Sequence, residues 1–215
     1  MDNITIEGVF IKWLGNAGFM IKGDGMVIYI DPANIREKVP EADMADLLLI
    51  THEYLGHCDP DSIRKVRKSD CTTLIPEDMS LQFRGDARRI MAGDSLTGEL
   101  SIKGVDIEVV PSYESCDDTT SLGHGVGYFL SFAGLNIYHA GHTCNAAELS
   151  SASLDIALLP IGGNGAMEEE QAANAVALLN PKFVIPIYES NAGVKIDNFV
   201  SMVREKSPSV KVVIL

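Results

Sequence analysis

The chain has 215 residues, of which 46% are hydrophobic and 22% charged, so it is long and apolar enough to form one globular domain over residues 1–215. Its 30 Asp and Glu against 17 Lys and Arg give a formal charge of −13, which disfavours a nucleic-acid partner because phosphate backbones require a basic surface. The first residues show no signal-peptide pattern, and no apolar run reaches the roughly 18–20 residues of a membrane span. We therefore expect a soluble, cytoplasmic protein with no membrane partner.

The first half of the chain alternates strand-like runs with turns. Strands are predicted over residues 4–13, 18–22, 26–30 and 47–51. Gly23-Asp24-Gly25 predicts a hairpin between the second and third of these runs. The run 47–51 is continuously apolar, as in a strand buried on both faces, and it ends directly at His52. Asp59 and Pro60 are N-cap and first-turn residues for a helix that extends to about residue 68.

The second half repeats this plan. Gly18-Phe19-Met20-Ile21, Gly25 and Ile28-Tyr29 are matched by Gly127-Tyr128-Phe129-Leu130, Gly134 and Ile137-Tyr138 at a constant offset of 109 residues (127 − 18). Further strands are predicted over 156–160, 183–187 and 210–215, and helices over about 167–179 and 196–204. Strands interleaved with helices indicate a layered α/β protein of two similar halves.

The four cysteines are Cys58, Cys71, Cys116 and Cys144. In a cytoplasmic chain of this size we expect buried or partly buried free thiols rather than a disulfide framework. Three of the four lie beside loops that contain histidine, so metal ligation by Cys58, Cys116 or Cys144 is an open alternative.

All five histidines fall in three short loops. His52 and His57 follow the run 47–51, His124 precedes the second hairpin, and His139 and His142 follow its second strand. Imidazoles and carboxylates that converge from several strand ends are what a metal-dependent hydrolase needs, because zinc binds nitrogen and oxygen ligands and keeps one position open. The arrangement predicts a shared cleft.

Several segments together carry a resemblance to a known family. They are Trp-Leu-Gly-Asn-Ala-Gly-Phe at 13–19, Ile-Asp-Pro at 30–32, Leu-Ile-Thr-His-Glu at 49–53, Gly-Val-Gly-Tyr at 125–128, Ile-Tyr-His-Ala-Gly-His-Thr at 137–143, Leu-Leu-Pro-Ile-Gly-Gly at 158–163 and Val-Ile-Pro-Ile-Tyr at 184–188. With them the chain resembles the metallo-β-lactamase superfamily, in the branch of metal-dependent hydrolases similar to ascorbate-6-phosphate lactonase. The resemblance implies a four-layer αββα metallo-β-lactamase-like sandwich built from two pseudo-duplicated halves.

The resemblance also implies a metal site that is altered in this chain. His52 and His57 match the first and last histidines of the family motif, whereas Tyr54 replaces a ligand histidine and Gly56 replaces the ligand aspartate. Three further positions also differ from the family: His142 stands at the bridging aspartate, Tyr188 at the final histidine and Asn16 at a histidine near the metal centre. A family-type two-metal site cannot be assembled from this set.

Three readings stay open. In the first, a single zinc is held by His52, His57 and His142, with Tyr188, Glu189 or a neighbouring cysteine joining. In the second, the scaffold has lost its dinuclear zinc and its catalysis, and it serves as a binding or regulatory homologue that binds a small molecule, forms a homo-oligomer or partners an active paralogue. In the third, acid–base chemistry proceeds without metal, with His52, His142, Tyr54 and Glu53 as the candidate residues.

Some polar residues have simpler roles. We expect Asp31 to stabilise a turn or nearby loop, Asp59 to cap a helix and His139 to be packed.

Overall fold

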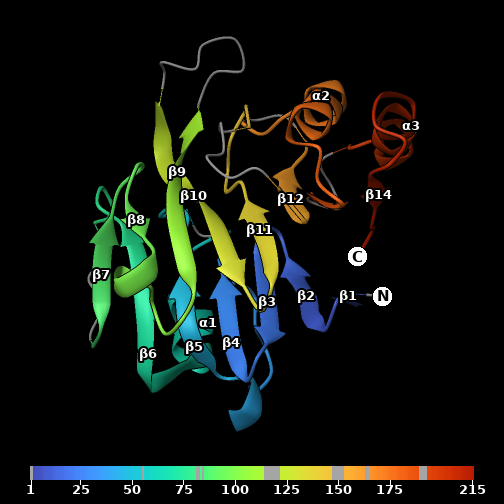
Figure 1. Ribbon diagram of the computed structural model, residues 1–215. Helices are drawn as coiled ribbons and strands as arrows, with labels where there is room; N and C mark the ends of the chain where they lie inside the picture. The colour runs from blue at the N-terminus through green and yellow to red at the C-terminus, as the bar shows by residue number, and fades with distance from the viewer. Residues whose placement is uncertain are drawn as a thin grey trace. The chain divides into compact units, whose positions relative to one another are not determined.

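The computed structural model describes residues 2–54, 56–80, 83, 85–113, 122–146, 153–162, 165–188 and 193–215. The chain divides into two compact units, Met1–Met91 with Leu215, and Ala92–Ile214. Each unit contains one seven-stranded sheet (Figure 1). Within the described residues, no helix is long and apolar enough to cross a membrane.

The sheet of the first unit has its strands in chain order. They are β1 (Asn3–Ile6), β2 (Val9–Gly15), β3 (Gly18–Gly23), β4 (Met26–Ile30), β5 (Ala45–Leu49), β6 (Arg67–Pro76) and β7 (Ala87–Ile90). The first four strands are joined antiparallel, and β4 to β7 are parallel. The unit also contains the 3-10 turn η1 (Glu41–Asp43) and one helix, α1 (Pro60–Val66).

The sheet of the second unit is also ordered along the chain. Its strands are β8 (Ser95–Leu96), β9 (Asp106–Tyr113), β10 (Leu122–Phe132), β11 (Leu135–His139), β12 (Ile156–Pro160), β13 (Phe183–Ile187) and β14 (Lys211–Val212). Here too the first four strands are antiparallel and the last four parallel. The 3-10 turn η2 (Gly98–Leu100) and the helices α2 (Glu169–Leu179) and α3 (Ile196–Lys206) complete the unit.

The predicted repeat is confirmed down to its register. Phe19 pairs with Ile30 in β3–β4, and Tyr128 pairs with His139 in β10–β11, each shifted by 109 residues (128 − 19 and 139 − 30). The two hairpins also share a closely packed glycine, Gly18 in the first and Gly127 in the second. A Cβ on Gly18 would lie 2.9 Å from the backbone oxygen of Asp31, and a Cβ on Gly127 would lie 3.0 and 3.1 Å from the backbone oxygens of His139 and Ala140. Both hairpins therefore pack against a strand end so closely that a side chain has no room.

Each unit has its own apolar cluster. In the first, Ile63 and Val66 of α1 pack with Leu48 of β5 and Tyr29 of β4. In the second, α2 and α3 contact each other, and Phe199 and Val203 of α3 join Val176 of α2 and strand residues in one cluster. Leu47, Leu48 and Leu49 are all fully buried, which confirms the prediction of a strand buried on both faces.

Three predicted boundaries are corrected. The run 4–13 is two strands, because Glu7 and Gly8 form a turn with φ of +46° and +89°. Helix α1 ends at Val66 rather than about residue 68, since Arg67 is extended (φ −75°, ψ 125°) and begins β6. The last strand covers Lys211–Val212 rather than residues 210–215.

Candidate metal site

The candidate site is built where two neighbouring parallel strands end. Asp31 follows β4 directly, and Thr51 and His52 follow β5 after Ile50. Parallel strands bring their carboxyl ends to the same edge of a sheet, so these side chains meet. The backbone holds the edge together, because Asp31 N donates to Leu49 O at 3.0 Å. Asp31, His52 and His57 offer potential ligand atoms that all lie within 4.8 Å of one another.

Asp31 is the centre of this group. Its carboxylate is fully buried and accepts hydrogen bonds from Thr51 N (2.7 Å) and Thr51 Oγ1 (2.5 Å). His57 Nδ1 lies 2.7 Å from Oδ2 of the same carboxylate. The expected loop-stabilising role of Asp31 is confirmed by the Thr51 contacts, but its contact with His57 was not foreseen. The contact arises because Asp31 follows β4, and β4 pairs with β5, the strand before His52.

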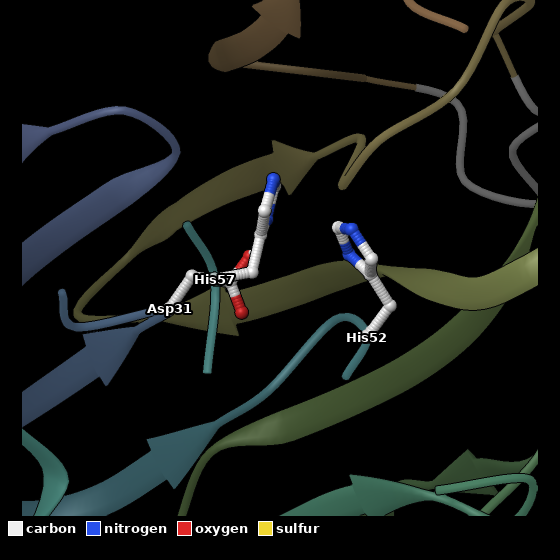
Figure 2. Close-up of side chains that lie close together, drawn as sticks. All are labelled: Asp31, His52 and His57. Atoms are coloured by element: carbon white, nitrogen blue, oxygen red, sulfur yellow. The ribbon is translucent and has the colours of Figure 1, made fainter. Parts of the chain in front are cut away.

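Thr51 extends the network to the second imidazole. Its Oγ1 lies 3.0 Å from His52 Nδ1 and 3.3 Å from His57 Nδ1. The ring centroids of the two histidines are 3.9 Å apart, and Figure 2 shows both rings extending to the same side with Asp31 at the base of His57. If the Thr51 hydroxyl donates to Asp31, its oxygen accepts from His52 Nδ1–H, and His57 Nδ1–H donates to Asp31. In this assignment both imidazoles carry their proton on Nδ1, so Nε2 is the ring nitrogen with the lone pair.

This donor set fits a single cation. An imidazole that is protonated on Nδ1 binds zinc through Nε2, and a buried carboxylate on the far nitrogen of a ligand histidine is the usual orienting partner. Both oxygens of Asp31 are already engaged by Thr51, and Oδ2 also by His57. Asp31 therefore suits an orienting role better than direct ligation.

The residues at the altered family positions in this loop supply little to a metal. Tyr54 is 75% exposed, and its ring centroid lies 6.1 Å from that of His52. Gly56 has no side chain, and a Cβ built on it would meet Asn16 Nδ2 at 3.4 Å. Asn16 itself lies in the turn between β2 and β3, with φ of +48°.

Two other ionisable residues of the loop, Glu53 and Cys58, have altered pKa values. The Glu53 carboxylate accepts hydrogen bonds from Ser80 N (2.5 Å) and from the Ser80 hydroxyl. These bonds, with a smaller contribution from Arg89, hold the pKa of Glu53 below its usual value. Burial, followed by the charges of Asp31, Glu53 and Asp59, raises the pKa of the Cys58 thiol to about 12.

The cap of the following helix is as predicted. Asp59 accepts hydrogen bonds from Asp61 N (3.1 Å) and Ser62 Oγ (2.6 Å) at the start of α1. Burial alone would raise the pKa of Asp59, but these bonds, together with one from Asn34 N, lower it.

The candidates of the second unit lie near the ends of β11 and β13. His139 is fully buried and its Nδ1 accepts from Gly141 N at 3.1 Å, so the expectation of a packed histidine is confirmed. His142 is half-buried, and a Cβ on Gly165 (φ +89°) would lie 2.7 Å from its Nε2. Tyr188 directly follows β13 and is half-buried. Ligation by His142 or Tyr188 stays a prediction.

The cysteine prediction is partly wrong. Cys58 and Cys71 are buried free thiols, as expected. Cys144 is bonded in a disulfide, which contradicts the expected free thiol and leaves no thiolate there for a metal. An expectation drawn from the cellular compartment takes no account of which thiols the fold brings together. Cys116, Glu189 and the side chain of His124 lie outside the described residues.

The sequence and the fold match one class of protein. Residues 10–188 match the beta-lactamase superfamily domain. The structure is similar to that of a proposed metal-dependent hydrolase from Parabacteroides distasonis, with a TM-score of 0.80, 28% identity and coverage of 99% of this chain and 96% of that one. It is also similar to Igni18, a metallo hydrolase of Ignicoccus hospitalis, with a TM-score of 0.73, 25% identity and coverage of 96% and 94%. The mixed α/β fold with two sheets is thus that of the metallo-β-lactamase-like sandwich.

Within this superfamily the chain belongs to the UPF0173 metal-dependent hydrolase family. A UPF0173 metal-dependent hydrolase of Thermococcus kodakarensis is 34% identical over 190 residues, which is 84% of each chain. A second, from Thermococcus onnurineus, is 32% identical over 190 residues with the same coverage.

Proposed function

We propose that this chain is a metal-dependent hydrolase homologue that has lost the two-ion centre implied by its family resemblance and uses a single cation. The observation that carries the proposal is the cluster of Asp31, His52 and His57, in which Asp31 and Thr51 contact Nδ1 of the two imidazoles and so orient both rings. Zinc suits imidazole ligands, and His142 is proposed as the third protein ligand. The proposed reaction is hydrolysis of a small ester, lactone or phosphoester.

The loss of a second ion is supported by the donor set. Tyr54, Gly56, His142 and Tyr188 stand where the family resemblance requires two histidines and two aspartates. Without a shared carboxylate, two dications about 3.5–4 Å apart would repel each other with little compensation. The residues present therefore do not fit the two-ion centre.

Each residue of the network has a defined task in the proposal. His52 and His57 bind through Nε2. Asp31 keeps the proton on Nδ1 of His57, and Thr51 keeps it on Nδ1 of His52, so both rings stay in the ligating tautomer. When bound, a zinc ion supplies Lewis-acid chemistry, polarising a substrate oxygen and acidifying water.

A second candidate is a binding or regulatory homologue without catalysis, acting on a small molecule, as a homo-oligomer or beside an active paralogue. Two observations favour it: the exposed ring of Tyr54 offers nothing to an ion, and Gly56 leaves the aspartate position without a side chain.

Metal content of the purified, tag-free protein after zinc loading tests the proposal. We expect about one zinc per chain in the wild type and none in His52→Ala or His57→Ala. Asp59→Asn is a matched control, since it changes a carboxylate near the same loop and keeps a good N-cap. Absence of zinc from the wild type would overturn every metal-dependent version, and two ions per chain would overturn the loss of the second site.

Turnover separates the two candidates. If zinc binds but a panel of p-nitrophenyl acetate, γ-butyrolactone and p-nitrophenyl phosphate is not hydrolysed, the binding or regulatory homologue is favoured. A variant carrying Tyr54→His, Gly56→Asp, His142→Asp and Tyr188→His should bind two ions if the second site has decayed in place. If it binds no more zinc than the wild type, the cleft has been remodelled.

A further inference from the structure

The turn between β2 and β3 presents an unused amide at the metal site. The side-chain amide of Asn16 has no hydrogen-bond partner among the described residues, although the residue is half-buried. Its Nδ2 lies 3.4 Å from the place where Gly56 would carry a Cβ. That is the position at which the family resemblance expects an aspartate ligand. An amide with two donor hydrogens thus lies beside the position where the family motif would place a carboxylate.

The backbone around Asn16 is fixed in three ways. Trp13 Nε1 donates to Asn16 O at 2.7 Å and so fixes the backbone of the turn. Gly15, with φ of +95°, forms the irregularity in the β2–β3 pairing that precedes the turn. On the other side, Gly18 lies so close to Asp31 that a Cβ would be 2.9 Å from its backbone oxygen. The backbone that carries the amide is therefore held in place beside the strand end that carries Asp31, so only the side-chain torsions of Asn16 need to adjust to a ligand.

The N–H groups of the Asn16 amide can donate hydrogen bonds to a substrate oxygen atom. We propose that Asn16 binds the carbonyl oxygen of a neutral ester or lactone, in place of the second cation; this inference rests on the single-cation site proposed above. Asn16 would donate a hydrogen bond to that oxygen, and a cation held by His52 and His57 would supply Lewis-acid polarisation. Donors aimed at an oxygen that gains negative charge lower the barrier of acyl transfer.

Charge selects the substrate class. A phosphomonoester carries nearly two negative charges, and it would face one cation, a neutral amide and the buried carboxylate of Asp31. The whole chain also carries a formal charge of −13, which slows the approach of anions. A neutral carbonyl compound meets neither obstacle. Asn16 and Gly56 together therefore favour esters and lactones over phosphoesters.

Two variants test this role without disturbing the turn. Glycine and aspartate both accept the positive φ of residue 16, so Asn16→Gly removes the donors and Asn16→Asp replaces them with a charged acceptor. Asn34→Asp is the matched control, because Asn34 also has a positive φ (+58°) and its side chain is exposed. In zinc-loaded protein, both Asn16 variants should keep their zinc. Their kcat/KM for p-nitrophenyl acetate should fall about 10- to 100-fold, whereas Asn34→Asp should match the wild type.

A second readout does not depend on turnover. In ¹⁵N-labelled, zinc-loaded protein, the side-chain amide resonance of Asn16 should shift on titration with γ-butyrolactone and stay in place with inorganic phosphate. The inference is overturned if the resonance ignores the lactone, if phosphate shifts it equally, or if Asn16→Gly keeps full activity while the wild type hydrolyses the ester. Failure of the wild type to bind zinc would instead overturn the proposed function.

Discussion

Asp31 is the residue on which the candidate site depends most. It is a fully buried carboxylate whose two oxygens serve Thr51 and His57, and the same contacts fix the direction of both imidazoles. A buried charge of this kind is tolerated because Thr51 and His57 supply hydrogen bonds to it. Removal of the Asp31 carboxylate should therefore change the orientation of His52 and His57, even though Asp31 itself need not bind the ion.

Asp31→Asn should weaken zinc binding about 10- to 100-fold, the cost usual for losing a carboxylate that orients a ligand histidine. The amide places a donor against Nδ1–H of His57, so the ring turns or changes tautomer. Competition with a chromophoric chelator measures the affinity. Asp59→Asn should retain the wild-type affinity, and an Asp31→Asn protein that also retains it would refute the orienting role.

At the scale of elements, two loops far apart in the sequence are joined beside the site. Glu53 in the loop after β5 holds Ser80 in the loop after β6 through both its backbone N–H and its hydroxyl. Arg89 of β7 in turn donates to the carbonyl oxygens of Glu77 and Met79, at 2.8 Å each. The loop that carries His52 is thus supported by the loop after β6, which is in turn held by Arg89 of β7.

The lowered pKa of Glu53 makes this joint sensitive to acid. Because the carboxylate is stabilised in the folded state, its contribution to stability is present above the ordinary value of 4.5 and is lost as the pH falls through the lowered folded value. Urea denaturation between about pH 3 and 6 should show Glu53→Gln losing stability against the wild type at the upper end, with the gap closing toward the lower end. Ser80→Ala should behave alike, and a double variant should add little. A gap that is constant with pH would count against the contact.

The same elements show what the sequence could and could not foretell. The hairpin around Gly23-Asp24-Gly25 and the buried run of Leu47, Leu48 and Leu49 were predictable, because local turn chemistry and continuous apolar residues determine them. The contact of Asp31 with His57 depends on the parallel pairing of β4 with β5, and the bond between Glu53 and Ser80 spans 27 residues. Neither leaves a periodic pattern along the chain.

At the scale of the whole molecule, the dominant feature is the repeated sheet. The two glycines related by the repeat are Gly18 and Gly127. Neither has a positive φ, so glycine is required at both positions for steric reasons and not for its backbone conformation. A methyl group would meet backbone oxygens of the neighbouring strand end, which cannot move aside without disturbing the sheet.

Gly18→Ala and Gly127→Ala should therefore each cost about 1–3 kcal/mol of unfolding free energy, the usual range for overpacking. Gly56→Ala is the matched control, because its Cβ would make only an ordinary contact of 3.4 Å with a side-chain atom. Chemical denaturation measures all three. A Gly127→Ala protein as stable as the wild type would show that the second hairpin has slack that the first lacks.

The repeat also provides an internal reference for the site. Counting 109 residues on from Asp31 leads to Ala140, which follows β11 as Asp31 follows β4 and is packed on by Gly127 as Asp31 is by Gly18. Both positions are fully buried, yet one carries a carboxylate with three hydrogen bonds and the other a methyl group. The backbone frame is therefore not what demands an acid at this place. The charge of Asp31 is tolerated because Thr51 and His57 form hydrogen bonds with it. At the equivalent position of the second unit, the same backbone arrangement buries the uncharged side chain of Ala140.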